Sequence, residues 1–326
     1  LDNTPYKLRE WIDIKKINWY ILSKNPRAIK LLEENKDNIN WIYLSSNINA
    51  ILLLENNIDK IDWTSISYNE SAIEILENNL DKVNWQYLCK NKNAIHIIEK
   101  NKDDIDWHWL CSNSNAIHLI KDNIDKVNWM SSSLNPNAIE ILEKNLDKVS
   151  WLWMSRNPNA IHLLEKNPGL INWEFLSSNP NALHLLEKNT NKINWSIYTV
   201  NSNLNMINLL RYNYDTFDKS EWLTISSNPS ALPYIKDNLD KVNWTYFCRN
   251  TNPEILPILK NNMDKIDWVS LSGNPIIFEI DYHFLKERIK VIKKELIEKC
   301  FHPYRVLYYL KNFNYDIGED EYYVLF

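Results

Sequence analysis

Glycine is scarce in this sequence, with three residues, Gly169, Gly273 and Gly318, in a chain of 326. Average usage would be about 7%. A phosphate-cradling loop or a dinucleotide fingerprint needs two or three glycines within about six residues, and these three lie far apart. The sequence therefore excludes nucleotide sites that are built on a glycine-rich loop.

Long runs of one kind of residue are also missing. No apolar stretch approaches the roughly 18 residues of a membrane-spanning helix, and we find no signal-peptide pattern ahead of the fold. Basic and acidic residues are interspersed, and the net charge is −5. This balance favours neither nucleic acid nor a membrane surface as a partner.

Tryptophan and asparagine are abundant instead, with 15 Trp and 48 Asn. Tryptophan recurs at 22-residue spacing through nine residues, and three more follow after 27, 22 and 24 residues: Trp19, Trp41, Trp63, Trp85, Trp107, Trp129, Trp151, Trp173, Trp195, Trp222, Trp244 and Trp268. A fixed period of 20–50 residues indicates a repeat array. We therefore assign twelve repeats from about Ile17 to Ile280, each numbered from its tryptophan as position 0.

The residues around each tryptophan predict a short helix, helix A. Position −1 is Asn, Asp or Ser in every repeat except that of Glu221, and such side chains accept hydrogen bonds at a helix N-cap. Position −2 is Ile or Val except at Ser220, and position +3 is apolar in eleven repeats, a pairing typical of a hydrophobic staple. We predict a helix of five or six residues that starts at the tryptophan.

Position +6 is asparagine in all twelve repeats. These residues are Asn25, Asn47, Asn69, Asn91, Asn113, Asn135, Asn157, Asn179, Asn201, Asn228, Asn250 and Asn274. Proline follows in six repeats and is favoured at the first helical position, and apolar residues at +9, +10, +12 and +13 line one helical face. We predict that this asparagine caps a second helix, helix B. A further asparagine at +16, from Asn35 to Asn189 in eight successive repeats, is expected to end helix B in the left-handed conformation.

Asparagine at +6 is more strictly kept than a cap requires, because Ser or Asp would cap equally well. Only the amide adds two N–H donors to the accepting oxygen. We therefore infer that its oxygen caps helix B while its NH₂ group binds carbonyls at the end of helix A or in the adjoining repeat.

These patterns predict an all-α solenoid of about twelve two-helix repeats, elongated to about 100 Å at ~9 Å per repeat. A leucine-rich repeat of the same period is the alternative. That pattern needs an alternating Leu-x-Leu strand, whereas the apolar spacing here is i, i+1, i+3, i+4 and proline lies where a strand would need donors.

The ends of the chain depart from the repeat. We divide the sequence into an N-terminal cap at 1–16, one continuous solenoid at 17–280 and a C-terminal helical cap with an acidic tail at 281–326. Thr4-Pro5 is predicted to cap a helix that runs to about Ile12, and helices are predicted from Tyr282 to Lys299 and from Pro303 to about Lys311. Polar terminal caps are expected of a soluble solenoid, and we interpret the basic stretch after Tyr282 as a solvated face.

Cysteine and histidine give no metal or catalytic pattern. Cys89, Cys111 and Cys248 occupy position +4, where the other repeats have Ser or Thr, and Cys300 stands alone without C-x2-C spacing. We expect buried, reduced thiols, as in an intracellular protein. His96, His118, His162 and His184 share position +11, but stacked helices lie about 8–10 Å apart, too far for one zinc with bonds of ~2 Å. We interpret them as a solvent-facing stripe, and we expect no catalytic residue, cofactor or metal.

Positions +1, +2 and +5 of helix A vary freely between repeats, so the scaffold does not dictate them. Position +2 gathers aromatic residues and position +5 basic ones: Tyr43, Tyr87, Trp109, Trp153, Phe175 and Tyr246, with Lys24, Lys90, Arg156 and Arg249. Aromatic residues and arginine dominate binding hot spots, so these ten residues are our candidate interaction stripe. The alternative, which we favour, is that +2 is a half-buried packing position between neighbouring A helices.

The repeat consensus is Trp-x-x-Leu-Ser-x-Asn-Pro-Asn-Ala-Ile-x-Leu-Leu-Glu-Lys-Asn-x-Asp-Lys-Ile, and the segment from Trp173 to Ile193 shows it almost unbroken. It is similar to repeats in proteins of nucleocytoplasmic large DNA viruses, and His302-Pro-Tyr-Arg305 with Asn314-Tyr-Asp-Ile-Gly resembles their terminal element. The resemblance covers most of the chain. It implies an ankyrin-like helical scaffold that acts inside an infected host cell, and it supplies no catalytic residues.

We therefore expect a non-enzymatic protein–protein interaction scaffold, viral and intracellular, in the host cytoplasm or the virion. It would act as a monomer or within a hetero-complex, with a protein partner whose identity the sequence does not give. One alternative is a structural component of the virion or its assembly. Another is a reader of single-stranded RNA, in which helical repeats each bind one base. Two observations count against the RNA reader: the net charge is negative, and only four of the twelve +5 positions are basic.

Overall fold

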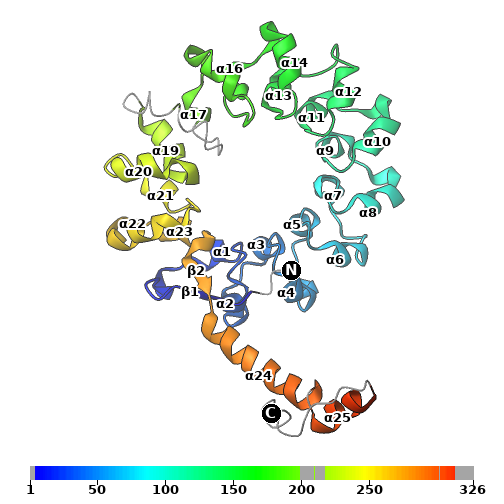
Figure 1. The fold of residues 1–326 in the computed structure, drawn as a ribbon. Coiled ribbons are helices and arrows are strands. Elements are labelled where there is room, and N and C mark those ends of the chain that lie inside the picture. The colour runs from blue at the N-terminus through cyan, green and yellow to red at the C-terminus, as the bar shows by residue number, and fades with distance from the viewer. Residues whose placement is uncertain (1–3, 199–208, 210–216, 301, 313–326) are drawn as a thin grey trace. The chain divides into compact units, whose positions relative to one another are not determined.

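The computed structural model describes residues 4–198, 209, 217–300 and 302–312. By its internal contacts the chain divides into two units, one made mainly of residues 8–278 and the other of residues 3–7 with 279–326. The first unit is an all-α solenoid of two-helix repeats, as the sequence predicts (Figure 1).

The A helices begin at the tryptophan in all repeats but one, as predicted. They are α1 (Trp19–Leu22), α3 (Trp41–Ser45), α5 (Trp63–Ser67), α7 (Trp85–Lys90), α9 (Trp107–Leu110), α11 (Trp129–Leu134), α13 (Trp151–Arg156), α15 (Trp173–Leu176), α17 (Trp195–Tyr198), α19 (Lys219–Ser227), α21 (Trp244–Phe247) and α23 (Trp268–Ser272). The predicted cap is confirmed; for example, Asn40 Oδ1 accepts the Tyr43 N–H at 2.9 Å. Ile39 and Leu44, the two residues of the predicted staple, are both buried.

The B helices begin later than predicted. They are α2 (Ile29–Glu33), α4 (Ile51–Glu55), α6 (Ile73–Glu77), α8 (Ile95–Lys100), α10 (Ile117–Asp122), α12 (Ile139–Glu143), α14 (Ile161–Lys166), α16 (Leu183–Glu187), α20 (Leu232–Asp237) and α22 (Leu256–Asn261). The oxygen of the +6 asparagine caps a turn ahead of the helix, as where Asn135 Oδ1 accepts the Asn137 N–H at 3.0 Å. Helix B itself starts four residues after the asparagine, behind an alanine that makes no side-chain cap.

The asparagine at +16 ends helix B, but the predicted left-handed conformation is wrong. Asn35 has φ −133°, Asn101 has φ −125° and Asn189 has φ −137°. The side chain instead donates back to the carbonyl four residues earlier, as from Asn145 Nδ2 to Ile141 O at 2.9 Å. Asparagine is therefore selected by its donor here, not by its tolerance of positive φ.

Short 3-10 turns connect most of these helices. Those that lead into a helix A are η1 (Ile14–Lys16), η2 (Lys36–Asn38), η3 (Ile58–Lys60), η4 (Lys102–Asp104), η5 (Ile124–Lys126), η6 (Pro168–Leu170), η7 (Thr190–Lys192) and η11 (Met263–Lys265). Three more, η9 (Pro229–Ala231), η10 (Pro253–Ile255) and η12 (Pro275–Ile277), follow a helix A. The short connections keep each repeat against the next.

Two repeats are irregular. In the tenth, helix A starts at Lys219 rather than at Trp222, because Asp218 and Glu221 form a reciprocal capping box; this accounts for the unusual residues before that tryptophan. In the twelfth, η12 is followed not by a helix B but by the strand β2 (Phe278–Ile280). The 27-residue spacing before Trp222 requires extra residues, around Tyr214, which lie largely outside the described residues.

The N-terminal segment is a strand, not the predicted helix. β1 (Tyr6–Leu8) pairs with β2 in a two-stranded sheet. At the other end, α24 (Tyr282–Cys300) and α25 (Pro303–Asn312) confirm the two predicted helices. Across the described part of the chain, no helix has both the length and the apolar character that a membrane crossing requires.

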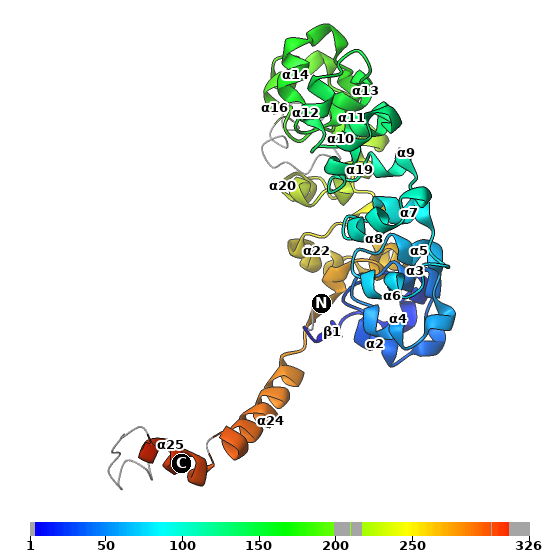
Figure 2. The ribbon, with the colours of Figure 1, turned by 90° about the vertical axis from the view of Figure 1, so that its right-hand side faces the viewer.

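The first and last repeats of the solenoid are in contact, so the array closes on itself and is not the elongated rod that we predicted. The Asn18 N–H donates to Ser272 Oγ at 2.9 Å, and Asn25 Nδ2 donates to Ser272 O at 3.1 Å. In the first unit, the A helices lie on the inner side and the B helices on the outer side (Figure 1). Figure 2 shows α7 and α9 side by side, and successive A helices make the main contacts between repeats.

Candidate functional site

The +6 asparagine is a structural element of every described interface between repeats. As predicted, its Nδ2 donates to carbonyls of the adjoining repeat. The two acceptors are at positions +4 and +6 of the preceding repeat; Asn135, for example, donates to Cys111 O and Asn113 O, each at 3.0 Å. The same pair of bonds is made by Asn47, Asn69, Asn91, Asn113, Asn157, Asn179, Asn250 and Asn274. Asn201 lies outside the described residues. These amides hold the scaffold together and are not available to a ligand.

The small residue at +4 is fixed by two further hydrogen bonds. Ser155 Oγ donates to Trp151 O at 2.8 Å and accepts the Asn172 N–H of the next repeat at 2.9 Å. Cysteine keeps the accepting role, since the Asn128 N–H lies 3.3 Å from Cys111 Sγ.

The cysteines at +4 are buried and free, as predicted. Burial raises the pKa of the Cys89 and Cys248 thiols to about 11, and it also raises the pKa of Cys111. A thiol with a raised pKa is a poor nucleophile, so these residues are structural.

Lysines from the inter-repeat turn cover the tryptophans. Lys60 Nζ lies 4.8 Å from the centre of the Trp41 ring, and Lys192 Nζ lies 4.4 Å from that of Trp173. This is cation–π geometry. The half-buried tryptophan ring therefore belongs to the repeat interface.

On the outer side, neighbouring B helices are joined by polar pairs. The histidines at +11 contact a glutamate of the preceding repeat; His162 Nε2 lies 2.7 Å from Glu143 Oε1, and His184 Nε2 lies 2.7 Å from Glu165 Oε1. These side chains are exposed, as we interpreted them. Among the described residues, no group of three or more His, Cys, Asp or Glu side chains is placed to hold a metal ion.

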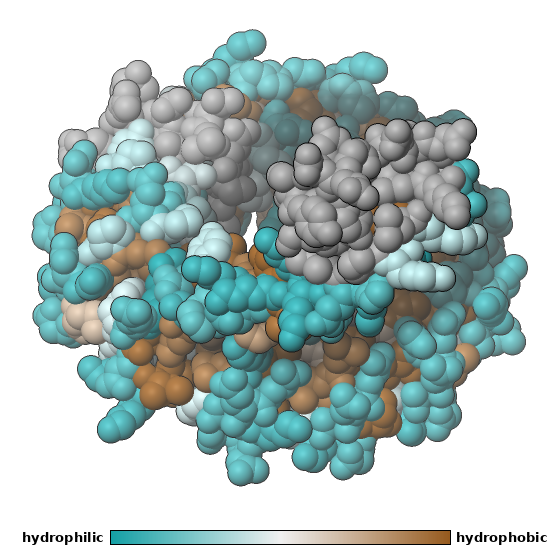
Figure 3. All heavy atoms as spheres, turned by 60° about the horizontal axis from the view of Figure 1, so that its bottom comes forward, coloured by the Kyte–Doolittle hydropathy of each residue, from teal (hydrophilic) through white to brown (hydrophobic). Residues whose placement is uncertain are grey.

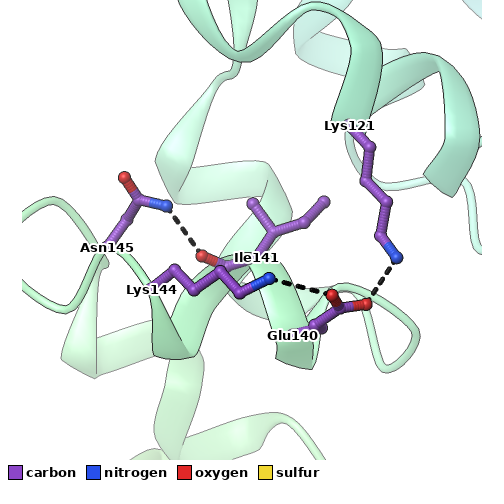
Figure 4. Close-up of polar contacts among 5 residues, drawn as sticks. All are labelled: Lys121, Glu140, Ile141, Lys144 and Asn145. Atoms are coloured by element: carbon purple, nitrogen blue, oxygen red, sulfur yellow. Dashed lines mark hydrogen bonds and ion pairs between the residues drawn. The ribbon is translucent and has the colours of Figure 1, made fainter.

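Glu140 occupies position +11 in place of histidine (Figure 4). In this pair the acidic side chain is at +11, and the basic one comes from the preceding repeat. It forms ion pairs with Lys121 of the preceding repeat and, at 3.0 Å, with Lys144 of its own helix. Hydrogen bonds from these two lysines lower the pKa of Glu140 to about 2. A small pocket beside this cluster, of about 310 Å³, includes Ile124 and Asn145 in its lining, and its charged groups already pair with one another.

The aromatic residues at +2 lie between neighbouring A helices. The rings of Trp153 and Phe175 meet edge to face with centroids 5.2 Å apart. The ring centres of Tyr43 and of Tyr20 in the preceding repeat are 4.8 Å apart, and Lys90 Nζ lies 4.3 Å from the centre of the Trp109 ring. These are the contacts of the packing alternative, and all the +2 aromatics except the exposed Tyr87 are half-buried: Tyr43, Trp109, Trp153, Phe175 and Tyr246.

The basic residues at +5 are more accessible. Lys24, Arg156 and Arg249 are exposed, while Lys90 is half-buried against Trp109 and Tyr68. No acidic residue occurs at +5 or +2 in any repeat, and Glu174 is the one acid at +1. The variable face of the A helices is therefore basic in a chain whose net charge is −5.

Position +1 carries apolar side chains that our candidate stripe did not include. Tyr20, Ile42, Met130, Leu152 and Val269 are all exposed. The signal was present in the sequence, because +1 varies as freely as +2, but we selected positions by aromatic and basic character. In Figure 3, hydrophobic residues form patches on a largely hydrophilic surface.

Two of the exposed apolar residues come from the two repeats that meet where the array closes, and a third comes from the repeat that follows. Val269 belongs to the last repeat, Tyr20 to the first and Ile42 to the second, and Val269 and Tyr20 are each 51% exposed. A pocket of about 270 Å³ lies at this junction, lined by Ile21, Arg249, Thr251, Val269, Ser270, Gly273, Asn274 and Pro275. We call the pocket together with Tyr20 and Ile42 the seam patch.

The local sequence shapes this pocket. Gly273 occupies position +5, where a Cβ would meet Ile21 Cγ2 at 3.0 Å. Arg249 is held at the rim by its Nε, which donates to Ser270 Oγ at 3.2 Å, and its guanidinium lies 5.1 Å from the Tyr246 ring centre. The seam patch thus combines an apolar depression with a positioned cation.

No family model, curated protein or solved structure matches this chain.

Proposed function

We propose that this protein is a protein-interaction scaffold that binds its partner on the variable face of the A helices, at the seam patch. The observation that supports the proposal is that Val269 lines a pocket at the junction while exposing its side chain, and that Tyr20 and Ile42 expose apolar side chains at the same +1 position in the next two repeats. Exposed apolar side chains gathered around a depression are typical of interaction sites.

The partner chemistry follows from the residues of the seam patch. Tyr20, Ile42 and Val269 suit an apolar side chain, and Arg249 suits a carboxylate, which a guanidinium binds well. Lys24, exposed at +5 of the first repeat, adds a second positive charge just after the end of α1. A segment with an apolar residue beside Asp or Glu therefore fits this surface best.

The expected setting follows from the sequence resemblance. We propose that the scaffold is a viral protein that acts inside an infected host cell, where its partner would be a host protein or another viral one. We propose a non-enzymatic role; in its support, the asparagines at +6, the small residues at +4 and the histidines at +11 hold one repeat to the next.

An affinity pull-down from infected host cells tests the proposal. Val269→Asp places a negative charge in the seam patch, where it would repel an acidic partner. Leu52→Asp is the control, because it makes the same kind of change on helix α4 at a residue that is 61% exposed. We expect Val269→Asp to lose the bound protein and Leu52→Asp to keep it. Equal retention by both variants would contradict the proposal, and nuclease-sensitive, salt-dependent recovery of RNA in place of a protein would favour an RNA reader.

A further inference from the structure

Helix α24 carries a narrow apolar seam with regular spacing. Tyr282, Leu285, Ile289, Ile292 and Leu296 follow one another at intervals of three, four, three and four residues. This is the a/d pattern of a coiled coil, in which each residue inserts between four residues of a facing helix. In the described part of the chain most of the seam is exposed, since Ile289 is 62% exposed and Leu296 is 49% exposed, while Leu285 is half-buried.

Basic residues flank this seam. In the same register, Lys286 and Lys293 occupy e positions and Arg288 a g position, with Glu295 as the one acid among the four flanking residues. Within the described part of the chain, Lys286, Arg288 and Lys293 form no ion pair. The glutamates Glu287 and Glu298, at the f and c positions, pair with Lys290 at 2.7 Å and Lys294 at 3.9 Å.

The flanks make a second copy of this helix a poor match. Parallel pairing of two α24 helices would set Arg288 against Lys293. Antiparallel pairing would set Lys286 against Lys293 on one flank and Arg288 against Glu295 on the other, so it gains no net charge attraction. Like charges at these positions disfavour pairing, and opposite charges set the choice of partner.

We propose that α24 is a docking helix that forms a coiled coil with an amphipathic helix of a partner protein, one with Asp or Glu beside its apolar seam. The site lies outside the repeats, so it is independent of the function proposed for the seam patch. The apolar pattern runs from Tyr282 to Leu296, about two heptads and about 21 Å at 1.5 Å per residue, and the next d position is Lys299.

Binding to a designed helix measures this directly. The probe is a fluorescein-labelled 21-residue peptide with Ile at a, Leu at d and Glu at e and g, titrated with the full chain and followed by fluorescence anisotropy. We expect saturable binding that weakens as salt is added, because the flanking charges contribute to it. The same peptide with Lys at e and g is expected not to bind.

Two matched pairs of variants locate the binding on the seam. Ile292→Asp changes a d position, and Val291→Asp makes the same kind of change at its exposed neighbour at c. Lys293→Glu reverses a flanking charge, and Lys294→Glu reverses its neighbour at f. We expect the seam variants Ile292→Asp and Lys293→Glu to weaken binding about tenfold or more, and Val291→Asp and Lys294→Glu to change it less than about twofold.

Four results would overturn the proposal. The acidic and basic peptides could bind alike or not at all. Both members of a pair could lose binding equally while circular dichroism shows all variants folded. Vesicles with anionic lipid could bind the full chain through the same residues while the acidic peptide does not, which would make α24 a membrane-surface helix. A dimer in sedimentation that Ile292→Asp dissociates would also contradict the choice of partner.

Discussion

At the scale of single residues, the amide group accounts for the abundance of asparagine. At +6 the oxygen closes a turn while the nitrogen reaches two carbonyls of the preceding repeat; at +16 the nitrogen closes helix B. Aspartate accepts but cannot donate when ionised, so it could take only the oxygen's role at +6 and no part of the role at +16; serine has a single O–H donor. The asparagine at −1 differs, because only its oxygen is needed to cap helix A, and three repeats have aspartate there.

We therefore expect Asn135→Asp and Asn128→Asp to lower the free energy of unfolding by different amounts. In the first, a buried carboxylate would face the carbonyls of Cys111 and Asn113, and we expect the free energy of unfolding to fall by about 2–5 kcal/mol. In the second, the carboxylate still accepts the Ser131 N–H at the N-terminus of α11, and we expect a change below about 0.5 kcal/mol. Urea unfolding measures both, and equal shifts would contradict this reading of the amide.

Glu140 gives a prediction about pH. Its pKa is lowered to about 2 by hydrogen bonds from Lys121 and Lys144, so the folded state favours the ionised carboxylate. The stabilisation is present above the unfolded-state pKa of about 4.3 and is lost as the pH falls toward 2. We expect the carboxyl ¹³C shift of Glu140 to show an ionised group at pH 3.5, and Lys121→Ala to move the titration upward. A midpoint near 4.3 in the native chain would contradict the ion pairs.

At the scale of helices, repeats are joined by side chains at fixed positions as much as by apolar packing. The hydroxyl at +4 links the end of one helix A to the start of the next. Its removal would leave a partly buried backbone N–H, such as that of Asn172, without its partner. A buried donor without a partner costs about 1–3 kcal/mol.

Ser155→Ala and Ser178→Ala test this linkage. Ser155 Oγ accepts the Asn172 N–H of the next repeat, whereas Ser178 Oγ only donates to Phe175 O in its own repeat. We expect Ser155→Ala to lower the free energy of unfolding by about 1–3 kcal/mol and Ser178→Ala by less than about 0.5 kcal/mol. Similar losses in the two variants would show that the link between repeats is unimportant.

The helices were predictable from the sequence because their signals are local. The N-cap at −1, the staple between −2 and +3 and the apolar face of helix B each involve residues within a few positions of one another. The start of helix B was misplaced because the +6 asparagine caps a turn, as Asn135 does. The N-terminal strand was missed because β1 depends on β2, which lies far away in the sequence.

At the scale of the whole repeat unit, closure uses the same contacts as any other interface. Lys16 Nζ lies 5.1 Å from the Trp268 ring centre, and Asn18 and Asn25 bond Ser272 as their counterparts bond +4 of the preceding repeat. Arg27 Nη1 reaches Pro275 O at 3.3 Å, where other repeats use an asparagine. Closure depends on a small rotation between repeats that accumulates around the array, so the period alone could not predict it, nor the seam patch that it creates.

The distance between the first and last repeats tests this closure most directly. Tyr20→Cys and Val269→Cys place two dyes on exposed positions in a chain that also carries Cys300→Ser, and the buried cysteines at +4 are expected to label slowly. The closed array predicts high energy transfer, with attachment points on helices about 8–10 Å apart. An open solenoid of about 100 Å at ~9 Å per repeat would give almost no transfer, and that result would contradict the account.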